Sequence, residues 1–451
     1  MTRRSASVVV MTALGLILGA LALTSAVPRS PNDFLGDAEQ NAQQLVSQGR
    51  QIFRFDSFGD ETFWTDQLGL NQVVASVTPR QALALGLKVD SDALPRNLVE
   101  NIKHGRVNLD DPFVTVQLVK QNAVLGVIGS FNANGTLRSI GLSCALCHST
   151  MDNSVTFGVG KRIDGLANRD LNVGAIVASV PNLQPIVDLL RLGPNPSLTT
   201  DDVKNVLLSW GPGKFDAELF LDGKAFQPDG RSAATLLPNA RGLAGHNLHT
   251  WTGGWGTVTY WNAFVAVNEL HGIGTFFDER LDNVDQFPIA ARARLGHVST
   301  DPDHDQVTSK LPALHFYQLA LPAVTPRAGI DFDRAAAERG DALFSGKANC
   351  NSCHHEPLWT EPGWNQHSAD ELKIDIFQSD RSPGHAYRTM NLAGIFVRER
   401  GLFMLPENSG RFYHDGRFKT LLDTVKSYNL RFGLDLTDNE KTDLVEYLKS
   451  L

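Results

Sequence analysis

The sequence predicts a mainly α-helical protein, because helix signals are frequent along the chain and alternating strand patterns are few. Asp333 precedes an alanine-rich segment that runs to Phe344, which is the arrangement expected of a helix N-cap. Thr437–Glu440 has the form of a capping box, and it opens a terminal segment with leucines at helical spacing. With 451 residues, the chain is long enough for two or three domains with full cores.

The composition is that of a folded globular protein, with 42% hydrophobic and 20% charged residues. These values exclude disorder and a multi-span membrane topology. Lysine and arginine total 41 against 49 acidic residues, so the formal net charge is −8. Because no basic run appears either, the sequence does not indicate nucleic-acid binding.

The N-terminus reads as a secretory signal peptide over residues 1–26. Arg3 and Arg4 precede an uncharged apolar stretch, and Thr24–Ala26 offers small residues for cleavage. We therefore expect export to the periplasm, with no membrane span once the signal is removed. The alternative is an uncleaved N-terminal membrane anchor, since the apolar stretch is nearly long enough to cross a bilayer.

All four cysteines fall in two copies of the pattern C-x-x-C-H, which is the attachment site of a c-type haem. Two thiols bond the porphyrin edge, and the following histidine becomes the proximal iron ligand. The sequence therefore predicts two covalently bound haems, held by Cys144, Cys147 and His148 and by Cys350, Cys353 and His354. A four-cysteine zinc site and a pair of disulfides are the alternatives, but neither requires a histidine after the second cysteine.

The last 120 residues resemble the class I cytochrome c fold. In that family a glycine and an aromatic residue on the first helix cross a leucine and an aromatic residue on the last helix. Gly340 and Phe344, with Leu444 and Tyr447, match that spacing. The pattern of Gly340–Phe344 recurs upstream at Gly49–Phe53, in a helix expected to start near Asp37.

This repeat predicts two cytochrome c-like haem domains, an N-terminal one over 33–325 and a C-terminal one over 326–451. Cys350 lies six residues after Phe344, whereas Cys144 lies 91 residues after Phe53. The N-terminal domain is therefore expected to carry large insertions, over about 60–140 and 165–230. A helix is expected to begin near Thr200 in the second insertion.

Beyond the haem motifs, the chain resembles the bacterial di-haem cytochrome c peroxidase superfamily, which includes the di-haem enzyme that matures methylamine dehydrogenase. Phe412–Gly416 looks like the family's aromatic-His-Asp-Gly turn. Thr235–Ala240, followed by Trp251–Gly253, looks like the segment that leads to its Trp-x-Gly. Asn268–Leu270 looks like its Asn-x-x-Glu-Met run, shortened by a residue or two.

The resemblance implies a division of labour between the haems. The haem of His148 would react with peroxide, Glu269 would carry protons, Trp251 would bridge the haems, and the haem of His354 would transfer electrons. The alternative for Glu269 is a solvated carboxylate on a helix surface. The alternative for Trp251 is a core or pocket-lining aromatic residue.

The chain also departs from the family pattern. The switchable histidine ligand expected after the first motif is absent, since no histidine occurs from Ser149 to Gly245 and His246 and His249 are the first candidates. We therefore expect the first haem to be five-coordinate or water-bound in its ferric state. Where the family's calcium site has Thr-x-Pro, this chain has Arg388–Met390, which does not favour calcium.

At the second haem, Tyr428 occupies the position of the methionine ligand of the peroxidases, as in the quinone-maturing enzyme. The sequence leaves three rivals for this coordination position: Met390, Met404 and His414.

The sequence thus predicts a periplasmic di-haem c-type oxidoreductase, similar to a peroxidase, that uses hydrogen peroxide or dioxygen. A small electron-donor protein (a cytochrome c or a cupredoxin) or a protein substrate is the expected partner. Three alternatives stay open. They are an electron carrier without turnover, a dioxygenase resembling the di-haem rubber oxygenases, and a haem-containing partner or sensor module.

Overall fold

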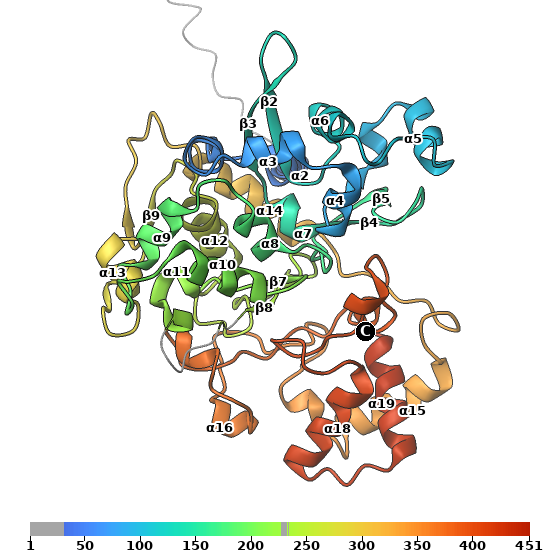
Figure 1. The fold of residues 1–451 in the computed structure, drawn as a ribbon. Helices are drawn as coiled ribbons and strands as arrows, with labels where there is room; N and C mark the ends of the chain where they lie inside the picture. The colour runs from blue at the N-terminus through green and yellow to red at the C-terminus, as the bar shows by residue number, and fades with distance from the viewer. Residues whose placement is uncertain (1–30, 227–231, 233) are drawn as a thin grey trace, which may run out of the picture. The chain divides into compact units, whose positions relative to one another are not determined.

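A computed structural model describes residues 31–226, 232 and 234–451 (Figure 1). The predicted signal peptide, residues 1–26, lies outside the described residues. The mainly α class is confirmed, since helices dominate the described residues and the strands found there form five sheets of two short strands each. Within the described ranges, no helix is long and apolar enough to cross a membrane. The chain divides into residues up to Gln44 and one compact unit, Leu45–Leu451, that contains both cysteine motifs.

The region before the first motif contains short helices and one hairpin. Its helices are α2 (Pro31–Phe55), the π-helix η1 (Thr62–Gln67), α3 (Leu70–Ser76), α4 (Pro79–Ala84), η2 (Ser91–Ala93), α5 (Arg96–Lys103) and α6 (Pro112–Lys120). Its strands are β1 (Val89–Asp90), β2 (Val127–Phe131) and β3 (Leu137–Leu142). Strands β2 and β3 pair antiparallel, and β3 leads directly to the first motif.

The region from the first motif to residue 320 is also mostly helical. Its helices are α7 (Ala145–His148), α8 (Val173–Ala178), α9 (Gln184–Leu190), α10 (Thr200–Ser209), α11 (Leu219–Asp222), η3 (Lys224–Phe226), α12 (Val258–Phe264), the π-helix η4 (Val265–Glu269), η5 (Glu279–Asp282), α13 (Pro288–Ala293), η6 (Thr308–Lys310) and α14 (Leu311–Ala320). Its strands are β4 (Ser149–Met151), β5 (Val159–Gly160), β6 (Arg162–Asp164), β7 (Lys214–Phe215), β8 (Thr235–Leu236), β9 (Phe276–Phe277) and β10 (His297–Val298). Strand β1 pairs parallel with β5, whereas β4–β6, β7–β8 and β9–β10 are antiparallel pairs.

The C-terminal region is built on three longer helices. They are α15 (Arg334–Ser345), α18 (Leu421–Phe432) and α19 (Asp438–Lys449), with the short helices η7 (Cys350–Ser352), α16 (Ala369–Leu372), η8 (Ser379–Arg381), α17 (Phe396–Glu399) and η9 (Pro406–Asn408) between and around them. Two predicted helix starts are confirmed here. Asp333 Oδ1 accepts from the Ala336 N–H at 2.8 Å, and Thr437 forms a capping box with Glu440. The helix expected near Thr200 is confirmed as α10, with Thr199 as its N-cap.

Helices α15 and α19 cross closely in the C-terminal region (Figure 1). A Cβ at Gly340 would lie 2.1 Å from the Asp443 carbonyl oxygen, so this crossing requires glycine. The Phe344 and Tyr447 rings contact each other beside it, with centroids 5.1 Å apart.

The same crossing occurs a second time, between α2 and α14. A Cβ at Gly49 would lie 1.9 Å from the Ala313 carbonyl oxygen, and the Phe53 and Tyr317 ring centroids are 5.7 Å apart. The upstream Gly-x-x-x-Phe pattern is thus a helix-crossing site. Its partner helix is α14, in which Ala313 takes the place that Asp443 has in α19. The sequence did not identify α14 as this partner.

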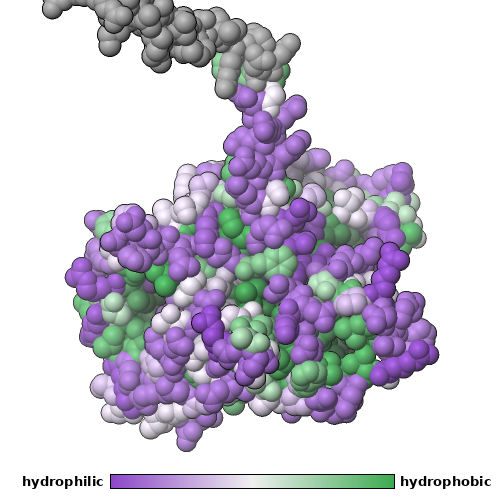
Figure 2. Space-filling model, turned by 90° about the horizontal axis from the view of Figure 1, so that it is seen from above, coloured by the Kyte–Doolittle hydropathy of each residue, from purple (hydrophilic) through white to green (hydrophobic). Residues whose placement is uncertain are grey.

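The two segments predicted to be insertions share one hydrophobic core. Leu68, Leu118 and Ile140 from the first segment belong to the same buried cluster as Val187 and Leu207 from the second. Each segment thus buries its apolar side chains against the other, which accounts for how segments of this length remain folded. Seen from above, the surface is mostly hydrophilic, with smaller areas where apolar side chains are exposed (Figure 2).

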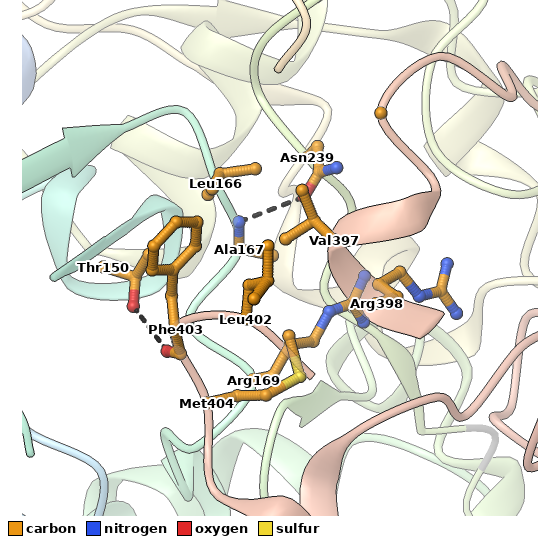
Figure 3. A pocket seen from close by; sticks show the side chains of 11 residues that line it. Thr150, Leu166, Ala167, Arg169, Asn239, Val397, Arg398, Leu402, Phe403 and Met404 are labelled. Carbon is orange, nitrogen blue, oxygen red and sulfur yellow. Dashed lines mark hydrogen bonds between the residues drawn. The ribbon is translucent and has the colours of Figure 1, made fainter. Parts of the chain in front are cut away.

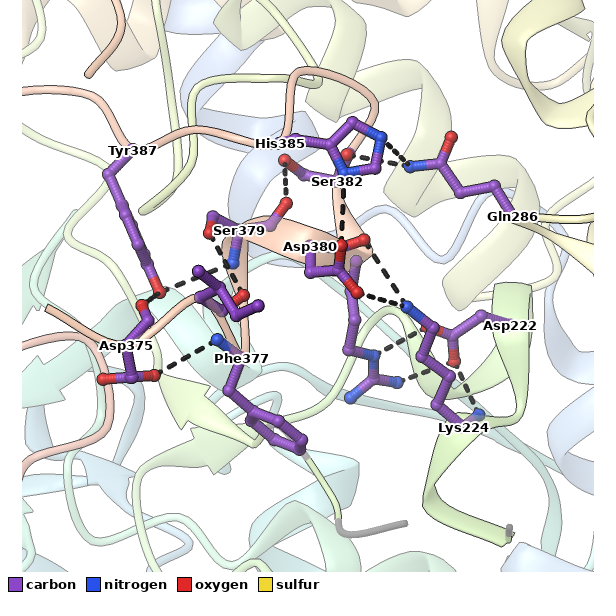
Figure 4. Close-up of polar contacts among 12 residues, drawn as sticks. Asp222, Lys224, Gln286, Asp375, Phe377, Ser379, Asp380, Ser382, His385 and Tyr387 are labelled. Atoms are coloured by element: carbon purple, nitrogen blue, oxygen red, sulfur yellow. Dashed lines mark hydrogen bonds and ion pairs between the residues drawn. The ribbon is translucent and has the colours of Figure 1, made fainter. Parts of the chain in front are cut away.

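A buried ion-pair network joins the second insertion to the C-terminal region (Figure 4). The Arg381 guanidinium, 1% exposed, donates to Asp222 at 2.7 and 2.9 Å and to Asp216 at 3.2 Å. At its edge, Lys224 pairs with Asp380 at 3.0 Å. These contacts hold the segment that contains residues 375–388 against the segment that contains α11.

Candidate functional site

The first cysteine motif lies between strands β3 and β4, where backbone hydrogen bonds hold it in place. The Gly165 N–H donates to the His148 carbonyl at 2.7 Å, and the Asn168 N–H donates to the Cys147 carbonyl at 2.8 Å. The His148 Nδ1 atom lies 3.1 Å from the Pro238 carbonyl oxygen. If Nδ1 carries the proton, Nε2 keeps a free lone pair for a metal. Burial lowers the pKa of His148 to about 4, which favours the neutral imidazole that binds metals.

The second motif repeats this arrangement at η7. The His354 Nδ1 atom lies 3.0 Å from the Trp359 carbonyl oxygen. Burial lowers the pKa of His354, while the backbone carbonyls of Trp359 and Met390 raise it. In both motifs the second ring nitrogen is left for a ligand, which is how histidines that bind metal are commonly oriented in proteins.

The described residues show neither a disulfide nor a four-cysteine metal site. All four thiols are free. Burial raises the pKa of Cys144 and Cys147 to about 12, whereas redox-active thiols have lowered pKa values. In the part of the chain that the structure describes, the four thiols form no shared metal site. The one group there with metal-ligand proximity is Cys353 with Glu361 and His367.

Glu269 ends a π-helix that directly continues α12. Its Oε1 atom is buried and has no hydrogen-bond partner, and the carboxylate lies close enough to Cys147 to raise the pKa of that thiol. Burial, and then the charge of Glu218, raises the pKa of Glu269 to about 8. This environment differs from that of a solvated surface carboxylate, and single-turn π-helices often occur at functional sites.

Several buried polar atoms in the chain segment that leads to Glu269 also lack partners. They include Nε1 of Trp261, Nδ2 of Asn262, Nδ2 of Asn268 and Nε2 of His249. Buried polar groups in folded proteins are normally satisfied, so the three unpartnered atoms on α12 and η4, together with that of His249 upstream, indicate a missing ligand. Together with the oriented His148 and the free thiols, these atoms fit a bound c-type haem.

Trp251 lies where the segment before α12 meets the C-terminal region. Its indole N–H donates to the Leu236 carbonyl at 2.8 Å, and its own carbonyl accepts from the Arg388 N–H at 3.2 Å. The Leu236 N–H in turn donates to the His414 carbonyl at 2.8 Å. The buried indole therefore packs within the segment that follows the first motif, and the backbones of Trp251 and Leu236 bond residues that follow the second.

Tyr428 lies on α18 near both cysteines of the second motif. Burial raises the pKa of Tyr428, the charge of Arg431 lowers it, and Cys350 and Cys353 add smaller effects. The Arg431 guanidinium lies 4.5 Å from the centre of the Tyr428 ring. Burial is the largest of these effects, so the pKa of Tyr428 lies above its ordinary value, and the nearby cation offsets part of that rise.

The three rivals of Tyr428 lie in different surroundings. The Met390 backbone lies beside His354, the predicted proximal ligand. Met404 lines a pocket with Thr150, just after the first motif. The His414 ring stacks on Tyr387, and its Nε2 lies 3.6 Å from Asp375.

Sequence reasoning missed two groups near the first motif. Glu218 is buried, with a pKa that burial raises to about 7, and its charge reaches Glu269. Arg169 is buried close enough to His148 for its charge to lower the pKa of that histidine. Neither residue lies in a recognisable motif, so no signal in the sequence marked them.

Comparisons with known proteins found a similar sequence and two solved structures that align. No family model matches the chain. A stretch of 198 residues is 27% identical to the cytochrome-c peroxidase IdrP1 of Denitromonas iodatirespirans and covers 33% of this chain. The match covers 51% of IdrP1, so the chain spans about half the length of this curated relative.

Two solved structures also align, each with a TM-score of 0.28, which is too low to support an argument. One is hydrazine synthase of Kuenenia stuttgartiensis, 19% identical over 48% of this chain and 72% of that one. The other is a MauG-like protein associated with microbial copper homeostasis, 18% identical over 60% of this chain and 87% of that one. The sequence match to IdrP1 confirms the resemblance to the bacterial di-haem cytochrome c peroxidase superfamily.

Proposed function

We propose that the chain is an exported di-haem c-type oxidoreductase that reduces hydrogen peroxide, or activates dioxygen, at the haem of His148. Electrons would come from a small donor protein, such as a cytochrome c or a cupredoxin, or from a protein substrate, through the haem of His354. The observation that carries the proposal is the buried, unpartnered Oε1 atom of Glu269, whose carboxylate charge reaches Cys147. The name of the relative IdrP1 supports the same class of reaction.

Each proposed residue has a defined task. A bound c-type haem would supply the iron that binds the oxidant and exchanges electrons. The neutral His148 ring, oriented by Pro238, would hold that iron. Peroxide reduction to two waters consumes two protons, and Glu269 Oε1 would move a proton between the two peroxide oxygens. Trp251 would lie on the electron path, and Tyr428 would close the second iron to exogenous ligands.

The test is a comparison of purified holoproteins. Acid-acetone extraction should leave two haems bound per chain, and cyanide should bind the resting ferric wild type.

Peroxide consumption should fall by about 10²–10⁴-fold in E269Q, because the variant keeps the size of the side chain but cannot accept a proton. The wild-type rate should rise with pH up to about 8, where Glu269 ionises, and this slope should be absent in E269Q. E279Q, a change at the outer helix η5, is the matched control and should behave as wild type.

The other outcomes separate the alternatives. Two low-spin haems with no peroxide consumption and no cyanide binding would identify an electron carrier. Wild-type peroxide consumption in E269Q would assign Glu269 a structural role and contradict the proposed mechanism. One haem per chain would contradict the prediction that both motifs attach a haem.

A further inference from the structure

Beside the first motif, a small pocket contains two arginine side chains but no acidic residue. The pocket, about 10 Å³ in volume, lies between the segment that follows β6 and helix α17. Figure 3 shows Arg169 from the first element and Arg398 from the second, with their guanidinium groups next to each other. The rest of the lining is largely apolar, including Leu166, Val397 and Leu402.

The two guanidinium groups lack counter-charges. Arg169 is 6% exposed, and its Nη1 atom has no hydrogen-bond partner. The Nε atom of Arg398 is likewise buried without a partner, although another of its nitrogens donates to the Arg411 carbonyl. Among the described residues, no carboxylate forms an ion pair with either arginine. The adjacent Asp170 is already bonded to Lys88 at 2.7 Å.

A third cation makes the cluster more unfavourable. Burial holds the pKa of Arg169 far below its ordinary value, and the charges of Arg398 and Arg411 lower it further. Burial also lowers the pKa of Arg398 to about 10. The charge of Asp170 reaches Arg411, but no carboxylate of the described residues pairs with Arg169 or Arg398. Buried charges in folded proteins are normally paired, so these two arginines require anionic groups from elsewhere.

The position of the pocket identifies the anion. The Asn168 N–H donates to the Cys147 carbonyl, which holds Arg169 next to the first motif, and the Arg169 charge reaches His148. A c-type haem carries two propionate carboxylates that its thioether bonds leave free. Guanidinium forks match carboxylates in geometry as well as charge. Two unpaired guanidinium groups therefore correspond to two propionates.

We propose that Arg169 and Arg398 bind the propionates of the haem held by Cys144, Cys147 and His148. The proposal rests on the proposed function, which places a haem at this motif. The arginines thus keep both propionates ionised and set the reduction potential of the first haem, while Glu269 and the iron ligands perform the chemistry.

The test measures the haem rather than turnover. Holoproteins of wild type, R169M, R169K and R398M are titrated spectroelectrochemically between pH 5 and 8, and the propionate bending band is recorded by resonance Raman spectroscopy. Losing a cation beside the first haem should favour ferric iron by about tenfold in R169M and R398M, a decrease of about 59 mV for one electron. The potential of both variants should become pH-dependent in the acidic range, and the propionate band should shift. R339M, which removes an exposed arginine on α15, is the control and should change none of these properties.

The outcomes separate this inference from the proposed function. A wild-type protein without a haem at the first motif would refute the proposed function itself. A first haem with wild-type potential, pH profile and propionate band in R169M and R398M would refute only the inference. If the methionine variants do not accumulate, R169K decides, because an unchanged propionate band in that variant contradicts a bidentate contact. In the wild type, phosphate can be added at constant ionic strength. A reduction potential that shifts with the phosphate concentration until the shift saturates would show that a free anion occupies the pocket, and would also refute the inference.

Discussion

At the scale of single residues, the candidate chemistry depends on polar groups that the fold buries without partners. Glu269 and Arg169 have opposite charges, yet both have buried side-chain atoms with no hydrogen-bond partner. Isolated burial of this kind is costly, so such groups in a native protein indicate a ligand or a reaction. Tyr428 differs from them, because its ring already contacts the cation Arg431.

The first residue-scale prediction concerns Tyr428. Replacement by phenylalanine removes the oxygen that we expect to bind the second iron and leaves the ring in place. Y428F should therefore add a high-spin ferric signal and a second cyanide-binding site, and the potential of the second haem should rise, because an anionic oxygen ligand favours ferric iron. EPR and optical titration with cyanide measure these changes.

The controls for Tyr428 are its methionine rivals. M404A should keep the six-coordinate spectrum of the second haem, since Met404 lines the pocket next to Thr150. If Y428F keeps that spectrum and M390A or M404A loses it, the ligand is a thioether and the assignment of Tyr428 is wrong.

At the scale of secondary-structure elements, two helix crossings of the same design hold the chain around the two motifs. In each, a glycine on the first helix meets a backbone carbonyl of the second, and a phenylalanine one turn later contacts a tyrosine. The first crossing closes a far longer stretch of chain than the second, because the two segments predicted to be insertions lie between its helices. These two segments build a core of their own, which is compatible with a close crossing of α2 and α14.

The element-scale prediction follows from the space at these glycines. G340A and G49A should each lower the free energy of unfolding by about 1–3 kcal/mol, because the added methyl would overlap a carbonyl oxygen. G36A on the same helix as Gly49 is the control, since nothing lies within 4 Å of its new methyl group, and it should be neutral or stabilising. Urea unfolding of the holoproteins measures the differences. Equal stability of G49A and G36A would contradict the close crossing at Gly49.

At the scale of the whole molecule, buried ion pairs connect regions that are distant in sequence. Arg381 joins the C-terminal region to Asp216 and Asp222, and Lys88 joins the first insertion to Asp170 and to the Phe403 carbonyl. Such pairs lie in the same unit as both motifs. They therefore contribute to the relative placement of the two candidate haem sites.

The whole-molecule prediction tests Arg381. R381M should destabilise the protein by about 3–5 kcal/mol, because it leaves two buried carboxylates without their cation. The matched control is R339M, which removes an arginine whose side chain is 60% exposed and should cost at most about 1 kcal/mol. Thermal unfolding measures both variants. A loss in R381M no larger than in R339M would mean that the network does not hold these regions together.

The sequence by itself determined the features that contiguous residues encode. The attachment motifs at Cys144–His148 and Cys350–His354 are local, because one short stretch of chain carries both thiols and the histidine. Helix starts at Asp333 and Thr437 could be predicted for the same reason, since a cap bonds a backbone N–H only three residues away. The mainly α class followed from these periodic and capping signals.

The tertiary structure alone decided the features that depend on distant residues. It identified α14 as the partner of Gly49, and it brought Glu218 near Glu269 and Arg398 near Arg169. None of these pairs is close in the chain, and an isolated glutamate or arginine in a sequence is most often solvated. Burial and the lack of a partner distinguish these residues, and both properties arise only when the chain has folded.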